Sequence, residues 1–401
     1  MILSYLKPKP ITLKILAAAI FNLVCFINIG MPLATIPVFV HRQLGYNSII
    51  AGIAVSAAYL ATFISRPGAG QWLDIKGAKS AVIIGLGISA CGGLLTILAL
   101  LFTHQPLMAL IIILLGRFCM GISESLASTG VNVWNIGRVG IENATHVISW
   151  NGVTTYGGMA IGAPLGVYLA SQPIGFIGGL SGFSILTVIL ASASMLLAST
   201  YPAIIPVSTA RRLPFTKVFK RISAYGCCLG LSTIGFGSIQ TFIALYFISN
   251  HWTGSAIALT IFGVSFVMIR FIFKNSLLKY GGYIVSIISL ITETIGLLLL
   301  ATQTSIIGAY IGAALTGCGF SLIYPALGVI AISKVSSENK GAALASFSLF
   351  LDMALFISGP LLGLIQSHLG YDYLYLSASF FAFCSVLLTY GLYYQNKTAS
   401  I

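Results

Sequence analysis

The stretch from Pro106 to Trp134 reads PLMALIIILLGRFCMGISESLASTGVNVW. It is long enough to cross a bilayer as a helix, yet it contains Arg117 and Glu124. A helix rises about 1.5 Å per residue, so Arg117 lies roughly 16 Å from the start of the span, near the bilayer centre. Glu124 follows seven residues later. Both side chains therefore project from one face of the helix, about 10 Å apart.

Charged side chains at this depth are costly. Each costs at least about 2.5 kcal/mol in the membrane and normally faces protein or water. One interpretation is a pathway for a substrate or for protons, and the alternative is a buried structural charge that ties two helices together. An arginine and an acid on one face of one span favour the pathway.

The composition is that of a membrane protein. The chain has 401 residues, of which 58% are hydrophobic and only 7% are charged, and its mean hydropathy is +1.01. Repeated apolar spans explain these values, whereas a soluble core of this size would carry more charge. The net charge of +13 does not indicate nucleic acid, because no basic run is interleaved with aromatic residues. The seven cysteines form no CxxC pair, so neither a disulfide framework nor a metal site is expected.

The apolar runs predict an all-α polytopic membrane protein with twelve transmembrane helices. The first six form an N-terminal half over residues 1–201, a basic cytoplasmic linker covers 202–222, and the last six form a C-terminal half over 223–401. The predicted spans are 13–40, 48–73, 79–103, 106–134, 145–170, 174–201, 223–249, 254–275, 282–302, 305–333, 341–367 and 371–395.

The loop charges predict the orientation. Lysine and arginine gather at one set of span ends, and the opposite loops contain only Arg42. Because cytoplasmic loops retain positive charge, both termini are expected in the cytoplasm and the protein in the inner or plasma membrane. The cationic ends carry Lys7, Lys9, Lys14, Lys76, Lys79, Arg138, Arg211, Arg212, Lys217, Lys220, Arg221, Lys274, Lys279, Lys334, Lys340 and Lys397.

The two halves repeat one another. Arg66 precedes Gly77 by eleven residues, and Arg270 precedes Gly281 by the same interval, each near the end of the second span of its half. Duplicated halves are how many secondary transporters build a binding site near the bilayer centre. Two further motif pairs follow in the same order: Gly121-Ile-Ser123 with Gly319-Phe-Ser321, and Glu142, 22 residues before Pro164, with Glu338, 22 residues before Pro360.

The loop after the second span has a specific signature. Gly70-Gln-Trp-Leu-Asp74-Ile-Lys76-Gly77-Ala-Lys79 resembles the cytoplasmic motif Gly-x-x-x-Asp-(Arg/Lys)-x-Gly-(Arg/Lys)-(Arg/Lys) of the major facilitator superfamily. The resemblance implies a latch that holds the inward-closed arrangement; an ordinary turn is the alternative. Ile75 stands where the family has a basic residue, so the partner of the aspartate is Lys76 or Arg66.

Two further motifs resemble branches of the same superfamily. Arg117-x-x-x-Gly121 is similar to the arginine motif of its proton-coupled members. Gly158-x-x-x-Gly162-Ala-Pro164-Leu-Gly166 resembles the motif of its drug:proton antiporter branch, although Ala163 separates glycine from proline here. Small residues four apart allow close helix contact, and the proline bends the span.

Two more acids lie inside spans. Asp352 is level with Arg117, in a span that bounds the central cavity in the resembled superfamily, and it is a second candidate for the site. Pro360 follows it in the same span and is expected to bend it. Glu293 lies in a span that is peripheral in that superfamily, so we expect a structural or interhelical bond to Thr292 or Thr294.

Taken with the resemblance, these residues predict a proton-coupled secondary transporter that exports a small organic compound by alternating access. The alternative is a proton symporter that imports a sugar or another small metabolite. Glu124 is the expected proton carrier, and Arg117 is expected to tune its protonation. Asp352 is the alternative proton carrier. The expected partners are the substrate, protons and lipid. We expect no enzyme activity, no cofactor, no metal and no nucleic-acid partner. The chain is expected to be a monomer.

Overall fold

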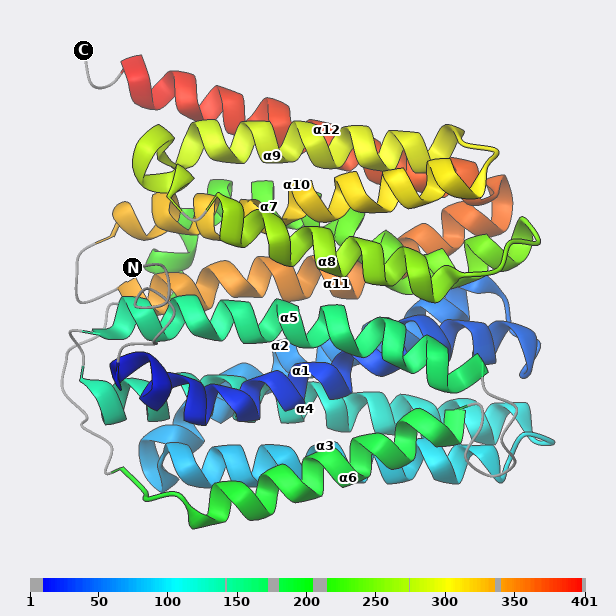
Figure 1. Cartoon of the computed structure of the whole chain (residues 1–401), viewed down its shortest axis with the longest axis horizontal. Helices are drawn as coiled ribbons and strands as arrows, with labels where there is room; N and C mark the ends of the chain where they lie inside the picture. Colours follow the sequence, from blue (N-terminus) through cyan, green and yellow to red (C-terminus); the bar gives the residue numbers. More distant parts are fainter. Residues whose placement is uncertain are drawn as a thin grey trace, which may run out of the picture. The chain divides into compact units, whose positions relative to one another are not determined.

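The computed structural model describes residues 10–140, 143–171, 180–204, 215–273, 275–335 and 340–398. This part of the chain forms twelve α-helices and no strand (Figure 1). The helices are α1 (Pro10–Arg42), α2 (Ser48–Lys76), α3 (Ala78–Leu100), α4 (Pro106–Val139), α5 (Ala144–Ser171), α6 (Leu180–Thr200), α7 (Phe215–Ser249), α8 (Ser255–Ile272), α9 (Ser276–Thr302), α10 (Ile306–Ser333), α11 (Lys340–Leu369) and α12 (Tyr371–Thr398).

The all-α prediction and the order of the spans are confirmed. Within the described residues, eleven helices are long and apolar enough to cross a membrane. The helix outside this set is α5, whose sequence is interrupted by glycine, threonine and asparagine. The last eight residues of the predicted linker, 215–222, already belong to α7. The arginines at 211 and 212 lie outside the described residues.

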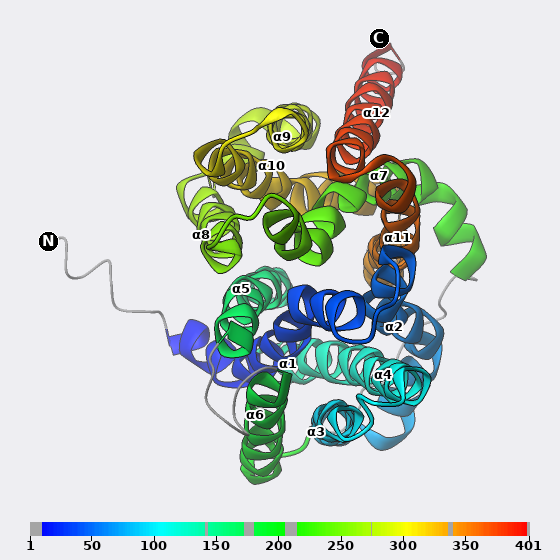
Figure 2. The ribbon, with the colours of Figure 1, turned by 90° about the vertical axis from the view of Figure 1, so that its right-hand side faces the viewer.

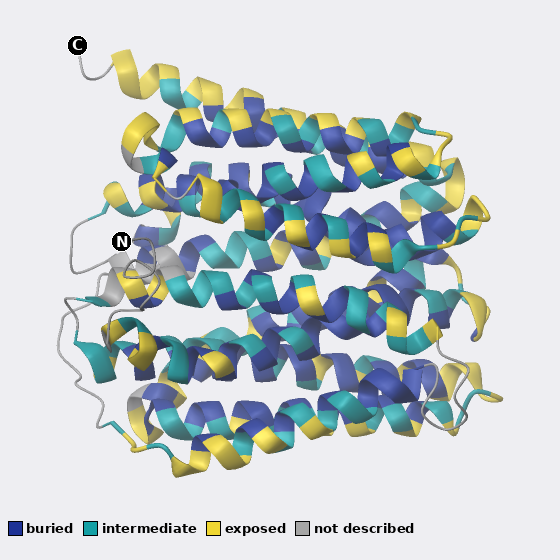
Figure 3. Ribbon diagram, viewed as in Figure 1, coloured by how far each residue is buried: buried dark blue, intermediate teal, exposed yellow. Residues whose placement is uncertain are grey.

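Lipid contact explains the exposed surface. Figure 3 shows exposed positions along the lengths of the helices as well as at their ends. They include large apolar side chains such as Leu98 on α3, Leu196 on α6 and Leu387 on α12. A membrane-spanning helix has no need of a polar outer face, because lipid rather than water covers it.

By its internal contacts the chain divides into two compact units. The first unit comprises Met1–Pro32 and Ala61–Ser208, and the second comprises Leu33–Leu60 and Thr209–Ile401. The end of α1 and the beginning of α2 are therefore grouped with the second unit. The division of the chain into two six-span halves stays a prediction from the internal repeat.

In the first unit, α3 packs against both α4 and α6 (Figure 2). The contact of α3 with α4 is close because Gly92 faces Gly116: a methyl group added to Gly92 would lie 3.0 Å from the carbonyl oxygen of Gly116. In the second unit, α9 packs against α10 in the same way. A methyl group added to Gly296 would lie 2.8 Å from the carbonyl oxygen of Gly312.

Two glycines repeat with the same backbone conformation. Gly77 joins α2 to α3 with φ 83°, and Gly281 interrupts α9 with φ 76°. This region of φ is open to glycine and strained for other residues. Gly92 and Gly296 each follow the corresponding glycine by fifteen residues. The repeat seen in the sequence thus extends to backbone conformation and helix packing.

Candidate functional site

The predicted charged pair of α4 is buried in the first unit. Arg117 is 1% exposed and Glu124 is 6% exposed. They lie two helical turns apart on α4, as the spacing predicts. Their burial excludes a lipid-facing position for either charge, and the cost of burying them has to be met by surrounding protein.

Two neighbouring helices contribute to the surroundings of Glu124. From α2, the Thr62 hydroxyl lies 3.2 Å from Glu124 Oε2 and 3.1 Å from the backbone carbonyl oxygen of Gly121. From α1, the buried Cys25 thiol is hydrogen-bonded to Ser123 and lies within electrostatic range of Glu124. The carboxyl group therefore sits where α1, α2 and α4 meet, among small polar groups.

Thr62 has two possible acceptors and one hydroxyl proton. When Glu124 is ionised, Thr62 can donate to the carboxylate. When Glu124 carries a proton, the acid can donate to Thr62 Oγ while Thr62 donates to the Gly121 carbonyl oxygen. Both protonation states of Glu124 thus find a hydrogen-bond partner without movement of the helices.

Asp352 lies in the second unit. It is 1% exposed on α11. Pro360 lies two turns further along the same helix, which continues through it. The structure thus brings Arg117 and Glu124 into one unit and Asp352 into the other.

The glycines of the α5 motif face the backbone of α1. A methyl group added to Gly158 would lie 2.8 Å from the carbonyl oxygen of Leu23, and one added to Gly162 or Gly166 would overlap the carbonyl group of Ile27 or Met31. The four-residue spacing places all three glycines on one side of α5, which lets the two backbones touch. Pro164 lies inside α5, and the helix continues on both sides of it.

The signature after the second span forms the junction of α2 and α3. The positive φ of Gly77 makes the turn, Lys76 is exposed at the end of α2, and Arg66 is partly buried on the same helix. Gly70 is also on α2, and a methyl group there would meet no described atom within 4 Å. Asp74 belongs to the last turn of α2, but its side chain lies outside the described residues.

Lys79 of this signature caps another helix. Its ammonium group donates to the carbonyl oxygens of Ser199 and Tyr201, each at 2.6 Å. These carbonyls lie at the C-terminal end of α6, where a cation is favoured by unpaired carbonyls and by the helix dipole. Trp134 Nε1 donates to the carbonyl oxygen of Pro202 at 3.1 Å, and Arg138 stacks over the Tyr201 ring. The start of the linker is thereby fastened to the first unit.

The predicted partners of Glu293 are wrong. The hydroxyl groups of Thr292 and Thr294 donate to carbonyl oxygens of their own helix, at Ile288 and Leu290. Glu293 instead accepts a hydrogen bond from Ser232 of α7. Residues adjacent to Glu293 on a helix point about 100° away from it, so their side chains cannot share its face.

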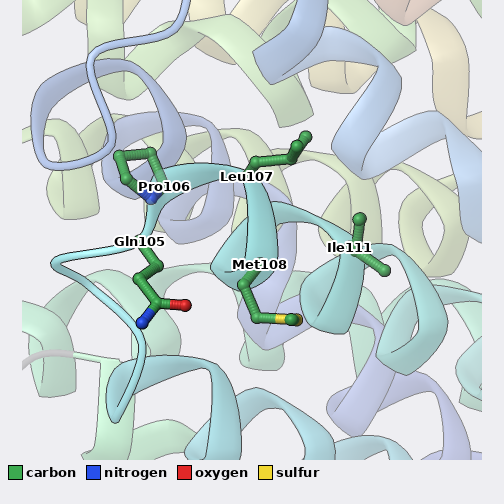
Figure 4. A pocket seen from close by; sticks show the side chains of 5 residues that line it. All are labelled: Gln105, Pro106, Leu107, Met108 and Ile111. Carbon is green, nitrogen blue, oxygen red and sulfur yellow. The ribbon is translucent and has the colours of Figure 1, made fainter.

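A surface hollow of about 300 Å³ lies at the start of α4 (Figure 4). Gln105 is its polar lining residue, and Pro106, Leu107, Met108 and Ile111 are the others. None of the candidate charged residues lines this hollow, so it does not coincide with the predicted site. Among the described residues, no group of three His, Cys, Asp or Glu could hold a metal ion.

The twelve described helices, eleven of them apolar enough to cross a membrane, and the buried charges within them define an α-helical polytopic membrane protein. A family model for the Major Facilitator Superfamily matches residues 18–275. An uncharacterized MFS-type transporter of Burkholderia pseudomallei (strain 1106a) is 40% identical over 389 residues, which cover 97% of this chain and 94% of the relative. The chain belongs to the major facilitator superfamily, and it is a transporter rather than an enzyme.

Solved structures share the fold. A D-xylose-proton symporter matches with a TM-score of 0.79 at 15% identity, covering 94% of this chain and 96% of that one. A mutant of the nucleoside transporter NupG matches with a TM-score of 0.74 at 17% identity, covering 94% of this chain and 98% of that one. The resemblance to the superfamily is confirmed, whereas membership of its drug:proton antiporter branch stays a prediction from the α5 motif.

Two functional candidates were missed in the sequence. Thr62 and Ser232 are single hydroxyl residues within apolar spans, and such residues commonly bond to their own helix. The signal that could have found Thr62 is its place four residues before Arg66. Ser232 had a better signal in the internal repeat. It precedes Glu293 by 61 residues, and Asn28 precedes Ser89 by the same interval at the equivalent positions of the first half.

Proposed function

We propose that the protein is a proton-coupled exporter of a small organic compound, acting by alternating access in the cell membrane with both termini in the cytoplasm. The observation that carries this proposal is the position of Thr62 between Glu124 and the Gly121 carbonyl oxygen. A proton carrier must be stable both with and without its proton, and this hydroxyl can bond to either form.

Arg117 fits the role of a fixed charge that tunes the carrier. A guanidinium group stays protonated, so it takes no part in proton exchange itself. Its field favours the ionised carboxylate, while burial favours the neutral acid. A change in water access or in substrate occupancy alters this balance, which is how binding of a proton and binding of a substrate become linked.

Export is supported by the α5 motif, whose three glycines form the seam with α1. Import with protons is the second candidate, because a D-xylose-proton symporter has the same fold. Fold alone does not separate the two directions. The two functions differ in how substrate binding affects bound protons. In an exporter that exchanges substrate for protons, substrate binding at a shared or competing site releases protons. In a symporter, substrate binding is accompanied by proton uptake.

Proton release from purified protein tests the proposal. The protein is placed in weakly buffered detergent solution with a pH indicator dye, and a panel of organic cations, organic anions, sugars and nucleosides is added in turn. We expect at least one organic compound to acidify the solution with wild-type protein. Alkalinisation by a sugar would support symport and overturn the export proposal.

Variants identify the carrier. Glu124→Gln should retain compound binding and abolish proton release. Thr62→Val removes the hydroxyl at nearly constant size and should weaken proton release, whereas the matched Thr62→Ser should retain it. Arg117→Lys keeps the charge but loses the planar donor geometry, so transport should fall. Normal release from Glu124→Gln together with loss in Asp352→Asn would assign the proton to Asp352 instead.

A further inference from the structure

The two units contain equivalent bridges between helices. In the first unit, Asn28 of α1 donates to the Ser89 hydroxyl of α3 at 3.2 Å. In the second unit, Ser232 of α7 donates to Glu293 of α9. Both pairs are 61 residues apart. The second bridge follows the first by 204 residues, the same offset that relates Arg66 to Arg270 and Gly77 to Gly281.

The chemistry of the two bridges differs. An amide and a hydroxyl, both permanently neutral, link the helices of the first unit. A hydroxyl and a carboxylic acid link the helices of the second. A neutral pair therefore suffices to hold this type of helix contact. The acid at position 293 can in addition bind and release a proton, which the contact alone does not require.

The surroundings of Glu293 favour a neutral acid. The side chain is 0% exposed, and in the described part of the chain Oε1 has no hydrogen-bond partner. Gly235 of α7 leaves room for the side chain, because a methyl group there would lie 2.9 Å from Oε1, and Gly319 of α10 packs against the backbone of Glu293. An ionised carboxylate that accepts one hydroxyl and meets no cation would be costly to bury.

The helices around Glu293 offer little charge to offset ionisation. The sequence of α10 contains no acid, lysine, arginine or histidine. The charged residues of α7 lie at its beginning, and those of α12 at its two ends. On α9 itself the other charged residue is Lys279, near its beginning. The remaining titratable groups of the packed helices are cysteines and tyrosines: Tyr225, Cys227, Cys228 and Tyr246 on α7, Tyr280 and Tyr283 on α9, Tyr310, Cys318 and Tyr324 on α10, and Tyr371, Tyr373, Tyr375, Cys384, Tyr390, Tyr393 and Tyr394 on α12.

We propose that Glu293 is a proton-binding site of the second unit, separate from Glu124. In the present arrangement Ser232 donates to Oε2 of the neutral acid. Loss of that proton requires water or new donors at the carboxylate, so it requires α7 to separate from α9 locally. A cation is excluded as the ligand because one carboxyl group and one hydroxyl fall far short of the six or more oxygens that ions such as Ca²⁺ bind.

Infrared difference spectroscopy tests this site without a substrate. Wild-type protein and Glu293→Gln, each reconstituted in lipid vesicles, are compared from mildly acidic to mildly alkaline pH. We expect wild type to show a carbonyl band of protonated carboxylic acid that disappears on alkalinisation, and Glu293→Gln to lack the contribution of Glu293 to that band while it keeps any contribution of Glu124. Deuterium exchange should shift the band.

A double variant controls for the structural bridge. Ser232→Asn with Glu293→Ser installs the neutral pair of the first unit, and it should fold, with thermal stability near that of wild type, while lacking the contribution of Glu293 to the titrating band. A Glu293-dependent band that does not change with pH would overturn the proposal and leave a purely structural acid. Spectra that are identical in wild type and Glu293→Gln would overturn it as well, as would a band that disappears on addition of sodium ions at constant pH. Because Glu124→Gln retains Glu293, failure here is distinct from failure of the proposed function.

Discussion

The seam between α1 and α5 gives a prediction whose sign differs at two glycines of the same helix. Gly162 faces α1: an added methyl group would lie 3.1 Å from the Gly30 Cα atom and would overlap the Ile27 carbonyl oxygen. Gly157 lies on the same helix, and a methyl group there would meet no described atom within 4 Å. Gly162→Ala therefore overpacks the seam, whereas Gly157→Ala does not.

The magnitude follows from two opposing contributions. Alanine favours a helix over glycine by about 0.5–1 kcal/mol, and this gain applies at both positions. Overpacking costs about 1–3 kcal/mol and applies at Gly162 alone, since its methyl group meets backbone that cannot rotate away. We expect Gly157→Ala to be neutral or slightly stabilised, and Gly162→Ala to be less stable than Gly157→Ala by about 1–3 kcal/mol.

Thermal unfolding in one detergent, followed by exposure of buried cysteines to a fluorescent maleimide, measures the difference. Each kcal/mol corresponds to a shift of about 2–4 °C in a protein domain of moderate size. The two variants should therefore differ by at least a few degrees, with Gly162→Ala melting first. If both alanines raise the melting temperature equally, α1 and α5 are not in backbone contact at Gly162 and the packing argument fails.

Three further predictions concern the orientation, the latch and the cap of α6. In intact cells, a single cysteine at Thr103 should react with an impermeant reagent and one at Arg212 should not, because the cationic loops are retained in the cytoplasm. Asp74→Asn should shift the population toward an inward-open state and slow transport, as measured by spin-label distances between the cytoplasmic ends of α2 and α11. Lys79→Met should destabilise the end of α6 by about 1 kcal/mol and increase protease cleavage after Tyr201, whereas Lys79→Arg should retain the cap.

Each of these has an outcome that contradicts it. Strong labelling at position 212 would reverse the predicted orientation. An unchanged distance distribution with normal transport in Asp74→Asn would reduce the signature to an ordinary turn. Cleavage that is equal in wild type and Lys79→Met would mean that Trp134 and Arg138 hold the start of the linker without the lysine.

The fold could be predicted because each helix that crosses a bilayer needs a continuous run of apolar residues. A span needs about twenty apolar positions in succession, so hydropathy alone predicts helices such as α3 and α10. Hydropathy did not predict the beginning of α7, because residues 215–222 include the three cations Lys217, Lys220 and Arg221 and yet are helical. The grouping of residues 33–60 with the second unit depends on tertiary contacts, which leave no trace in local hydropathy.

The candidate site could be predicted only in part, for a physical reason. A charge inside a span stands out against apolar sequence, which identified Arg117, Glu124, Glu293 and Asp352. A hydroxyl does not stand out, because serine and threonine are inexpensive in a helix and can bond to its own carbonyls. The partners that decide what each acid does therefore had to come from the structure.

Burial alone does not give these acids the same role. Glu124 has Thr62 beside it, with a second acceptor at Gly121, so its surroundings can accommodate both the carboxylate and the acid. Glu293 has the single hydroxyl of Ser232 and an Oε1 without a hydrogen bond in the described structure, so its surroundings suit the neutral acid alone. The first arrangement offers a hydrogen bond to both protonation states with the helices in place. The second permits proton exchange only when α7 moves away from α9, which makes the proton at Glu293 a reporter of helix movement within the second unit.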